Sequence, residues 1–195
     1  LPGRSAAIVP YETEIFGNPG SLHLFGQEAS GAIFKSRRSV AQSIGAAVDE
    51  IIFTGSATEA NNLALRGVVS YAQNVGEVRK PRIIVSSIEH ESVLETARAL
   101  EREGVEVCYL PVSRTGVIDH KALERGLTKN TVLVSIMYAN NEIGVIEPLA
   151  EIANIIKNRT TPYPLFHTDA SQALQFLDCR VPHLGVDLMT LSSHK

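Results

Sequence analysis

Two short stretches near the end of the sequence combine side chains that can carry covalent chemistry. In residues 165–172 an apolar run leads to Asp169, and in residues 187–195 a second apolar run leads to Lys195. Such runs are typical of parallel strands, which carry reactive side chains to the carboxyl edge of a sheet. A lysine amine can form a Schiff base with pyridoxal phosphate, and a carboxylate can keep the pyridine nitrogen protonated. The sequence therefore predicts a site for that cofactor.

The composition is that of a globular protein. The chain has 195 residues, of which 44% are hydrophobic and 20% charged, and its net charge is −3. No basic block predicts a nucleic acid or an anionic membrane as a partner. No apolar run approaches the roughly 20 residues that span a bilayer, and the start does not resemble a signal peptide. A soluble, cytoplasmic protein is expected.

The two cysteines, Cys108 and Cys179, lie far apart and lack the spacing of metal ligands. We expect both to be reduced and structural, and we expect no metal site. The sequence begins without a methionine and stops at Lys195, directly after a polar cluster. Domains seldom end at such a point, so we expect the chain to be a piece of a longer protein.

The order of the predicted elements indicates an α/β fold. Residues 1–20 contain several breakers and predict an extended N-terminal arm with a turn at 16–21, followed by a helix over 21–47 that ends near Gly45. From residue 51 onward, strands and helices alternate, which favours a mostly parallel sheet with helices on both faces. Residues 21–195 would form one cofactor-binding domain. The predicted strands are 51–53, 82–87, 105–110, 131–137 and the two near the end.

Polar residues follow these strands, and each has a functional and a plain interpretation. Residues 54–62, which begin as a small-residue turn, lead into a helix that runs to about Tyr71, and backbone N–H groups at the helix start could hold a phosphate. Alternatively, Thr58 only caps that helix. His90 lies between a strand and a helix, and Asn141 lies in a polar turn after 131–137. Each of these side chains either reaches the carboxyl edge of the sheet or serves local cap and turn chemistry.

Five motifs, taken in order, resemble those of cysteine desulfurases, which belong to the class V branch of fold type I pyridoxal-phosphate enzymes. The likeness runs from Phe16 to Lys195. The Asn-Asn-Glu-Ile-Gly and Ser-x-His-Lys elements are specific in combination. The motifs occupy residues 54–59, 89–90, 140–144, 167–172 and 192–195.

The resemblance implies a role for each matching residue. Lys195 would carry the cofactor and Asp169 would face its pyridine nitrogen. Gln172 would bind the ring oxygen, His90 would stack on the ring and transfer protons, and Asn141 would lie beside the cofactor or substrate. The phosphate would be held by nearby backbone and by Ala57, Thr58, Ser192 and His194.

The implied reaction converts L-cysteine to L-alanine, with the sulfur passed to an enzyme cysteine as a persulfide and then to an acceptor. The family's persulfide cysteine and its substrate-binding arginine lie downstream of the lysine, in a C-terminal small domain that this chain does not contain. A homodimer, a mitochondrial location in a eukaryote, and an iron–sulfur scaffold or sulfur carrier as acceptor are further implications. Two alternatives stay open. The protein is a selenocysteine lyase or another class V enzyme, such as an aminotransferase or epimerase, or it is a catalytically inactive partner in sulfur transfer.

Overall fold

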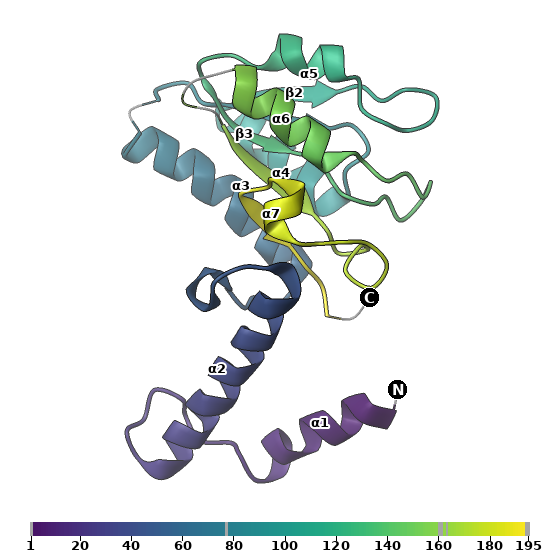
Figure 1. The fold of residues 1–195 in the computed structure, drawn as a ribbon. Coiled ribbons are helices and arrows are strands. Elements are labelled where there is room, and N and C mark those ends of the chain that lie inside the picture. The colour runs from purple at the N-terminus through teal and green to yellow at the C-terminus, as the bar shows by residue number, and fades with distance from the viewer. Residues whose placement is uncertain (1, 77, 160–161, 163, 194–195) are drawn as a thin grey trace. The chain divides into compact units, whose positions relative to one another are not determined.

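The computed structural model describes residues 2–76, 78–159, 162 and 164–193 (Figure 1). The chain divides into two compact units, Leu1–Ile52 and Phe53–Lys195. In the described part, no helix is both long and apolar enough to cross a membrane.

The first unit consists of helices. Helix α1 spans Pro2–Thr13, α2 spans Leu24–Ile44, and a short 3-10 helix, η1, spans Val48–Glu50. The prediction of an extended arm is therefore wrong. Pro2 stands at the first helical position, where its missing N–H is not needed, and Ala6 and Ala7 favour a helix.

The end of α2 at Gly45 and the turn before the helix agree with the sequence, whereas the helix begins at Leu24 and not at the predicted Ser21. Ser21 N donates to Asn18 O at 2.9 Å, which closes the predicted turn. Gly45 ends α2 in the left-handed conformation with φ 69°, as glycine commonly does after a helix. Residues 51–53 do not form the predicted strand. Ile51 is buried, whereas Ile52 and Phe53 are 70% and 51% exposed. A short apolar run predicts a strand only if a neighbouring strand pairs with it.

The second unit is built on a five-stranded sheet in the order β2-β1-β3-β4-β5. All four strand pairs are parallel, which confirms the predicted fold class, and β3 is central as predicted. The strands are β1 (Arg82–Ser86), β2 (Glu106–Leu110), β3 (Thr131–Ser135), β4 (Leu165–Asp169) and β5 (Leu188–Thr190).

Helices cover both faces of this sheet. Ile83 and Val85 of β1 share a core with α3 and α4, whereas Ile84 lies against Gly126 of α5. Because successive side chains of a strand point to opposite faces, α5 packs on the face away from α3 and α4. Figure 1 shows α5 and α6 together on that face. The helices are α3 (Ala57–Asn74), α4 (Glu91–Arg102), α5 (His120–Gly126), α6 (Leu149–Arg159) and α7 (Val181–Leu184).

Two glycines with positive φ allow a matched stability test. Gly185 ends α7 at φ +71°, and a Cβ there would lie 2.8 Å from the Ala153 Cβ atom; Gly144 has φ +70° with nothing within 4 Å. We expect Gly144→Ala to lower the free energy of unfolding by about 1 kcal/mol, from backbone strain alone. Gly185→Ala adds a steric clash and should cost about 2–4 kcal/mol. Chemical denaturation measures both, and equal losses would contradict the close packing of α7 on α6.

Candidate active site at the carboxyl edge of the sheet

The parallel strands bring several predicted site residues to one edge of the sheet. His90 follows β1, Asn141 follows β3, Asp169 ends β4, and Ser192 follows β5. Because all five strands run in the same direction, their carboxyl ends share this edge. His194 and Lys195 lie outside the described residues.

Asp169 is the most buried of the predicted site residues that the structure describes, with 6% of its surface exposed. Its Oδ1 accepts a hydrogen bond from Ser171 N at 2.9 Å, and its Oδ2 accepts one from Asn61 Nδ2 at 2.8 Å. The carboxylate is therefore held in place from two sides, by the turn after β4 and by helix α3.

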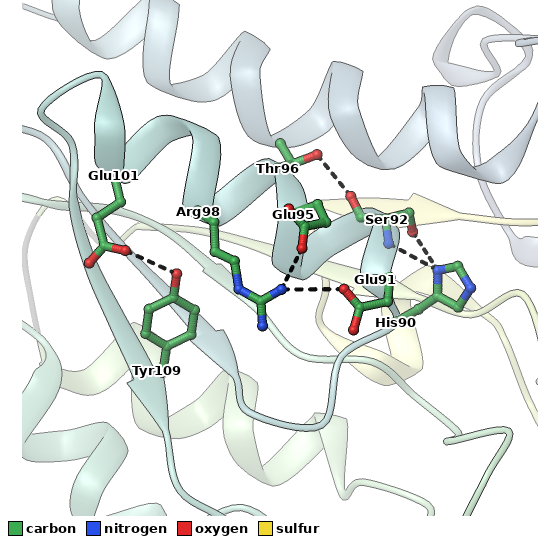
Figure 2. A network of polar contacts seen from close by, with 8 residues as sticks. All are labelled: His90, Glu91, Ser92, Glu95, Thr96, Arg98, Glu101 and Tyr109. Carbon is green, nitrogen blue, oxygen red and sulfur yellow. Dashed lines mark hydrogen bonds and ion pairs between the residues drawn. The ribbon is translucent and has the colours of Figure 1, made fainter.

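His90 forms the N-cap of helix α4, so the plain interpretation of this residue is confirmed. Its Nδ1 accepts a hydrogen bond from Ser92 N at 3.1 Å and lies 2.8 Å from Ser92 Oγ (Figure 2). A backbone N–H can only donate, so Nδ1 must be unprotonated, and in the neutral ring the proton is on Nε2. The cap leaves that second nitrogen available for chemistry, because the imidazole is exposed.

Asn61 connects these two residues, and the sequence did not predict its role. Its Nδ2 donates to Ser92 Oγ at 2.9 Å as well as to Asp169. The side chains Asp169, Asn61, Ser92 and His90 thus form one continuous hydrogen-bonded chain. A signal was present, because Asn61 stands four and eight residues before Leu65 and Val69 and so interrupts the buried stripe of α3.

The start of helix α3 lies near the same edge. Ser56, rather than Thr58, is the N-cap, because Ser56 Oγ accepts a hydrogen bond from Glu59 N at 3.1 Å. The alternative that Thr58 caps the helix is therefore wrong. Thr58 is exposed in the first turn next to Ala57 and shares a cavity of about 430 Å³ with His90. The positive end of the helix dipole at this point suits an anion.

The remaining predicted residues lie in the loops of this edge. Asn141 is exposed, whereas its neighbour Asn140 is buried and organises the turn. Asn140 Nδ2 donates to Ile88 O at 2.9 Å, and its Oδ1 accepts from Glu142 N and Ile143 N at 2.8 and 2.9 Å. Gln172 and Ser192 are half-buried in the segments that follow β4 and β5. Of the asparagine pair, Asn140 therefore carries out the predicted turn chemistry.

Buried titratable side chains surround Asp169. Burial lowers the pKa of His167 to about 4, with Asp169 opposing this effect, so His167 is neutral at pH 7. Its Nδ1 pairs with Ser135 Oγ at 2.8 Å and its Nε2 with Thr190 Oγ1 at 3.1 Å. Burial also raises the pKa of Glu89 well above its usual value, although Met137 N donates to it at 2.6 Å. His167 thus ties β3, β4 and β5 together beneath the site without adding a charge.

Glu147 provides a pH-dependent test of this electrostatic environment. Its side chain is 1% exposed and accepts a hydrogen bond from Ile118 N at 3.1 Å. Burial raises the pKa of Glu147 from 4.5 to about 7, with the Ile118 bond opposing the shift. The folded protein therefore binds this proton more tightly than the unfolded chain does. The resulting stabilisation is complete below pH 4.5 and is lost as the pH rises through 7.

We expect Glu147→Gln to remove this dependence. Between about pH 5 and pH 8, its free energy of unfolding should rise relative to that of the wild type by up to about 3 kcal/mol. Denaturation at a series of pH values measures the difference. Glu151→Gln, at an exposed position in the first turn of α6, is the control and should show no such trend. Parallel pH curves for Glu147→Gln and the wild type would contradict the buried, protonated carboxyl group.

The side chains at this edge fit pyridoxal 5′-phosphate. A buried carboxylate suits a protonated pyridine nitrogen, an imidazole suits the ring face, and a helix start suits the phosphate. Among the described residues, no group of three or more His, Cys, Asp and Glu side chains could hold a metal ion. Cys108 and Cys179 are free thiols.

Comparisons with known proteins agree with this chemistry. A cysteine desulfurase IscS from Dictyoglomus turgidum is 46% identical over 190 residues, which cover 97% of this chain and 46% of that protein. The human cysteine desulfurase is 44% identical over 97% of this chain and 40% of its own length. These curated relatives are more than twice as long as the matched region.

Solved structures share the fold. A NifS-like protein superposes with a TM-score of 0.92 at 37% identity, over 97% of this chain and 50% of its own. The structure of SspA in complex with cysteine has a TM-score of 0.92 at 34% identity, over 100% of this chain and 54% of its own. These matches confirm the predicted resemblance to cysteine desulfurases, whose family uses pyridoxal phosphate. The aminotransferase class-V family model matches residues 5–195, and the chain belongs to that family.

Proposed function

We propose that the protein is a pyridoxal-phosphate-dependent cysteine desulfurase and that residues 53–195 form its cofactor-binding part. The observation that carries this proposal is the buried Asp169 carboxylate, held at the end of β4 and connected to His90 by hydrogen bonds. The similarity to named cysteine desulfurases over 97% of the chain supports the same conclusion.

Each predicted site residue has its own role in binding the cofactor. When bound, pyridoxal phosphate supplies an electron sink for bonds at the α-carbon of an amino acid. Asp169 would face the pyridine nitrogen and keep it protonated, and Lys195 would bind the aldehyde carbon. The first turn of α3 at Ala57 and Thr58 would hold the phosphate, together with Ser192 and His194.

His90 acts as the proton carrier of the site. Its Nδ1 is occupied by Ser92, so Nε2 is the nitrogen that gives and takes protons. Gln172 would orient the ring through its oxygen, and Asn141, which is exposed, would lie beside the cofactor or substrate. The substrate is L-cysteine, which is the molecule bound in the SspA structure.

The product and the sulfur-transfer steps are inferred from the resemblance to cysteine desulfurases. L-alanine is the product, and the sulfur leaves as a persulfide on an enzyme cysteine before it passes to an iron–sulfur scaffold or a sulfur carrier. Cys179 is 3% exposed, and its pKa is raised by burial, so it is a poor nucleophile for this step. We also propose that the protein is a homodimer. Its location would be the cytoplasm, or mitochondria, as the name of the Drosophila melanogaster relative states for that protein.

Product analysis separates this function from its alternatives. The purified full protein, with pyridoxal phosphate and a reductant, should convert L-cysteine to L-alanine and sulfide. Alanine from selenocysteine but not from cysteine would identify a selenocysteine lyase, and amino-group transfer to a keto acid would identify an aminotransferase. Cofactor binding without any product would identify an inactive binding partner. Each of the last three results would overturn the proposed reaction.

A further inference from the structure

The amide of Asn61 has an unusual position for a polar group. It is 0% exposed on the face of α3 that also buries Leu65 and Val69 in the core. Its Nδ2 makes two hydrogen bonds, of 2.8 Å to Asp169 Oδ2 and 2.9 Å to Ser92 Oγ, which use both of its hydrogens. Its Oδ1, however, is buried without a hydrogen-bond partner within the described part of the chain.

Stability alone does not account for this amide. A buried oxygen without a partner costs free energy, and an apolar side chain on the same stripe of α3 would avoid that cost. The two N–H bonds therefore matter for what they hold in place. They join the end of β4 to the start of α4. The two acceptors lie 108 and 31 residues after Asn61 in the sequence.

The geometry at Ser92 extends this effect to the imidazole. Because Ser92 Oγ accepts the amide hydrogen, its own hydrogen is directed to His90 Nδ1, 2.8 Å away. Figure 2 shows Ser92 beside the His90 ring at the start of α4. Asn61 thereby sets the direction of the Ser92 hydroxyl and, through it, the orientation of His90.

We propose that Asn61 is a positioning residue that holds the Asp169 carboxylate and, through Ser92, the His90 imidazole in the arrangement needed to bind pyridoxal phosphate. This inference rests on the proposed function, because it assigns Asp169 and His90 to the cofactor. Asn61 acts through its hydrogen bonds to Asp169 and Ser92.

Two substitutions test the role of the amide hydrogens. Asn61→Leu removes both donors and keeps the volume similar. Asn61→Asp keeps the shape but places a second carboxylate next to Asp169, which can donate a hydrogen bond only when it is protonated. Asn74→Leu and Asn74→Asp are the matched controls, because Asn74 is exposed on the same helix and its Nδ2 donates to Ser70 O and Oγ at 2.9 and 3.2 Å.

The first measurement is the affinity for pyridoxal phosphate, from its absorbance change on titration into the full protein. We expect Asn61→Leu to bind about tenfold to a hundredfold more weakly than the wild type. Asn61→Asp should be weaker still near pH 8.5 and should recover about tenfold relative to the wild type near pH 6, where the carboxyl pair shares a proton. Glu89, His167 and His90 also lie near Asp169 or Ser92, but they are common to all variants, so they cancel in this ratio. The Asn74 variants should stay within about twofold at both pH values.

The second measurement needs no cofactor. The ring ¹⁵N resonances of His90, identified by their loss in His90→Gln, should show an unprotonated Nδ1 in the wild type. In Asn61→Leu, the Nδ1 resonance should move towards that of a more weakly hydrogen-bonded ring, while Asn74→Leu leaves it unchanged. Because Asn61→Asp is nearly isosteric with the wild type, it keeps the test open if Asn61→Leu does not fold.

The results distinguish this inference from the proposed function. Wild-type affinity and an unchanged His90 resonance in the Asn61 variants would overturn the positioning role but leave the desulfurase reaction intact. A pH-independent loss that is smaller in Asn61→Asp than in Asn61→Leu would also overturn it, because packing alone would explain that order. Wild-type protein that binds no pyridoxal phosphate would instead refute the proposed function, and the cofactor-free resonances would still decide the role of Asn61.

Discussion

The Asp169→Asn variant is expected to lose nearly all activity with L-cysteine while it remains folded. The amide that replaces the carboxylate is neutral and cannot balance a protonated pyridine nitrogen. Removal of one partner of a buried ion pair costs about 3–5 kcal/mol, which corresponds to a fall of about a hundredfold to a thousandfold or more in kcat/KM. Steady-state alanine production measures the effect.

A control for this variant lies at the opposite end of the same pair of strands. Asp187 Oδ2 accepts a hydrogen bond from Phe166 N at 2.8 Å, just before β5 begins. Asp187→Asn weakens a comparable bond to the backbone but lies away from the carboxyl edge, so its kcat/KM should stay within about threefold of the wild type. Equal activity losses in the two variants would indicate a structural role for Asp169 and contradict its place beside the cofactor.

Replacement of His90 should have the second large effect. General acid–base groups contribute about 10²–10⁴ to rate, so we expect kcat to fall by that factor in both His90→Ala and His90→Asn. The two variants differ in stability. Asparagine can accept the hydrogen bond from Ser92 N and preserve the N-cap, whereas alanine loses it at a cost of about 1 kcal/mol.

Kinetics and thermal unfolding of both variants separate these contributions. His183→Ala is the control, because His183 is exposed and pairs with Asp178 at 2.6 Å outside the site. If His90→Asn regained activity along with the helix cap, His90 would be a structural residue, and the proton-carrier role would be refuted.

The sheet could be predicted because each strand is marked by an apolar run within its own residues. Residues 131–137 form an almost unbroken apolar run, and they contain the central strand β3. Gly45 ends α2 as predicted, because a left-handed residue after a helix favours glycine. The positions of His90 and Asp169 after strands followed directly from this pattern.

Features that depend on tertiary partners could not be predicted. Residues 51–53 are apolar like the true strands, but they are not among the strands of the sheet that the structure describes. The N-terminal helix α1 contains Pro10, and the sequence alone favoured an extended arm there. The role of Asn61 depends on Asp169, which lies 108 positions away in the sequence.

Covalent mapping of the cofactor tests the central claim most directly. Protein loaded with pyridoxal phosphate is reduced with borohydride, digested, and searched by mass spectrometry for a phosphopyridoxyl-lysine. We expect the modification on Lys195 alone, with loss of the near-visible absorption band in Lys195→Ala and a weakened band in Asp169→Asn. Modification of any other lysine, or no modification in protein that retains its fold, would contradict the proposed site.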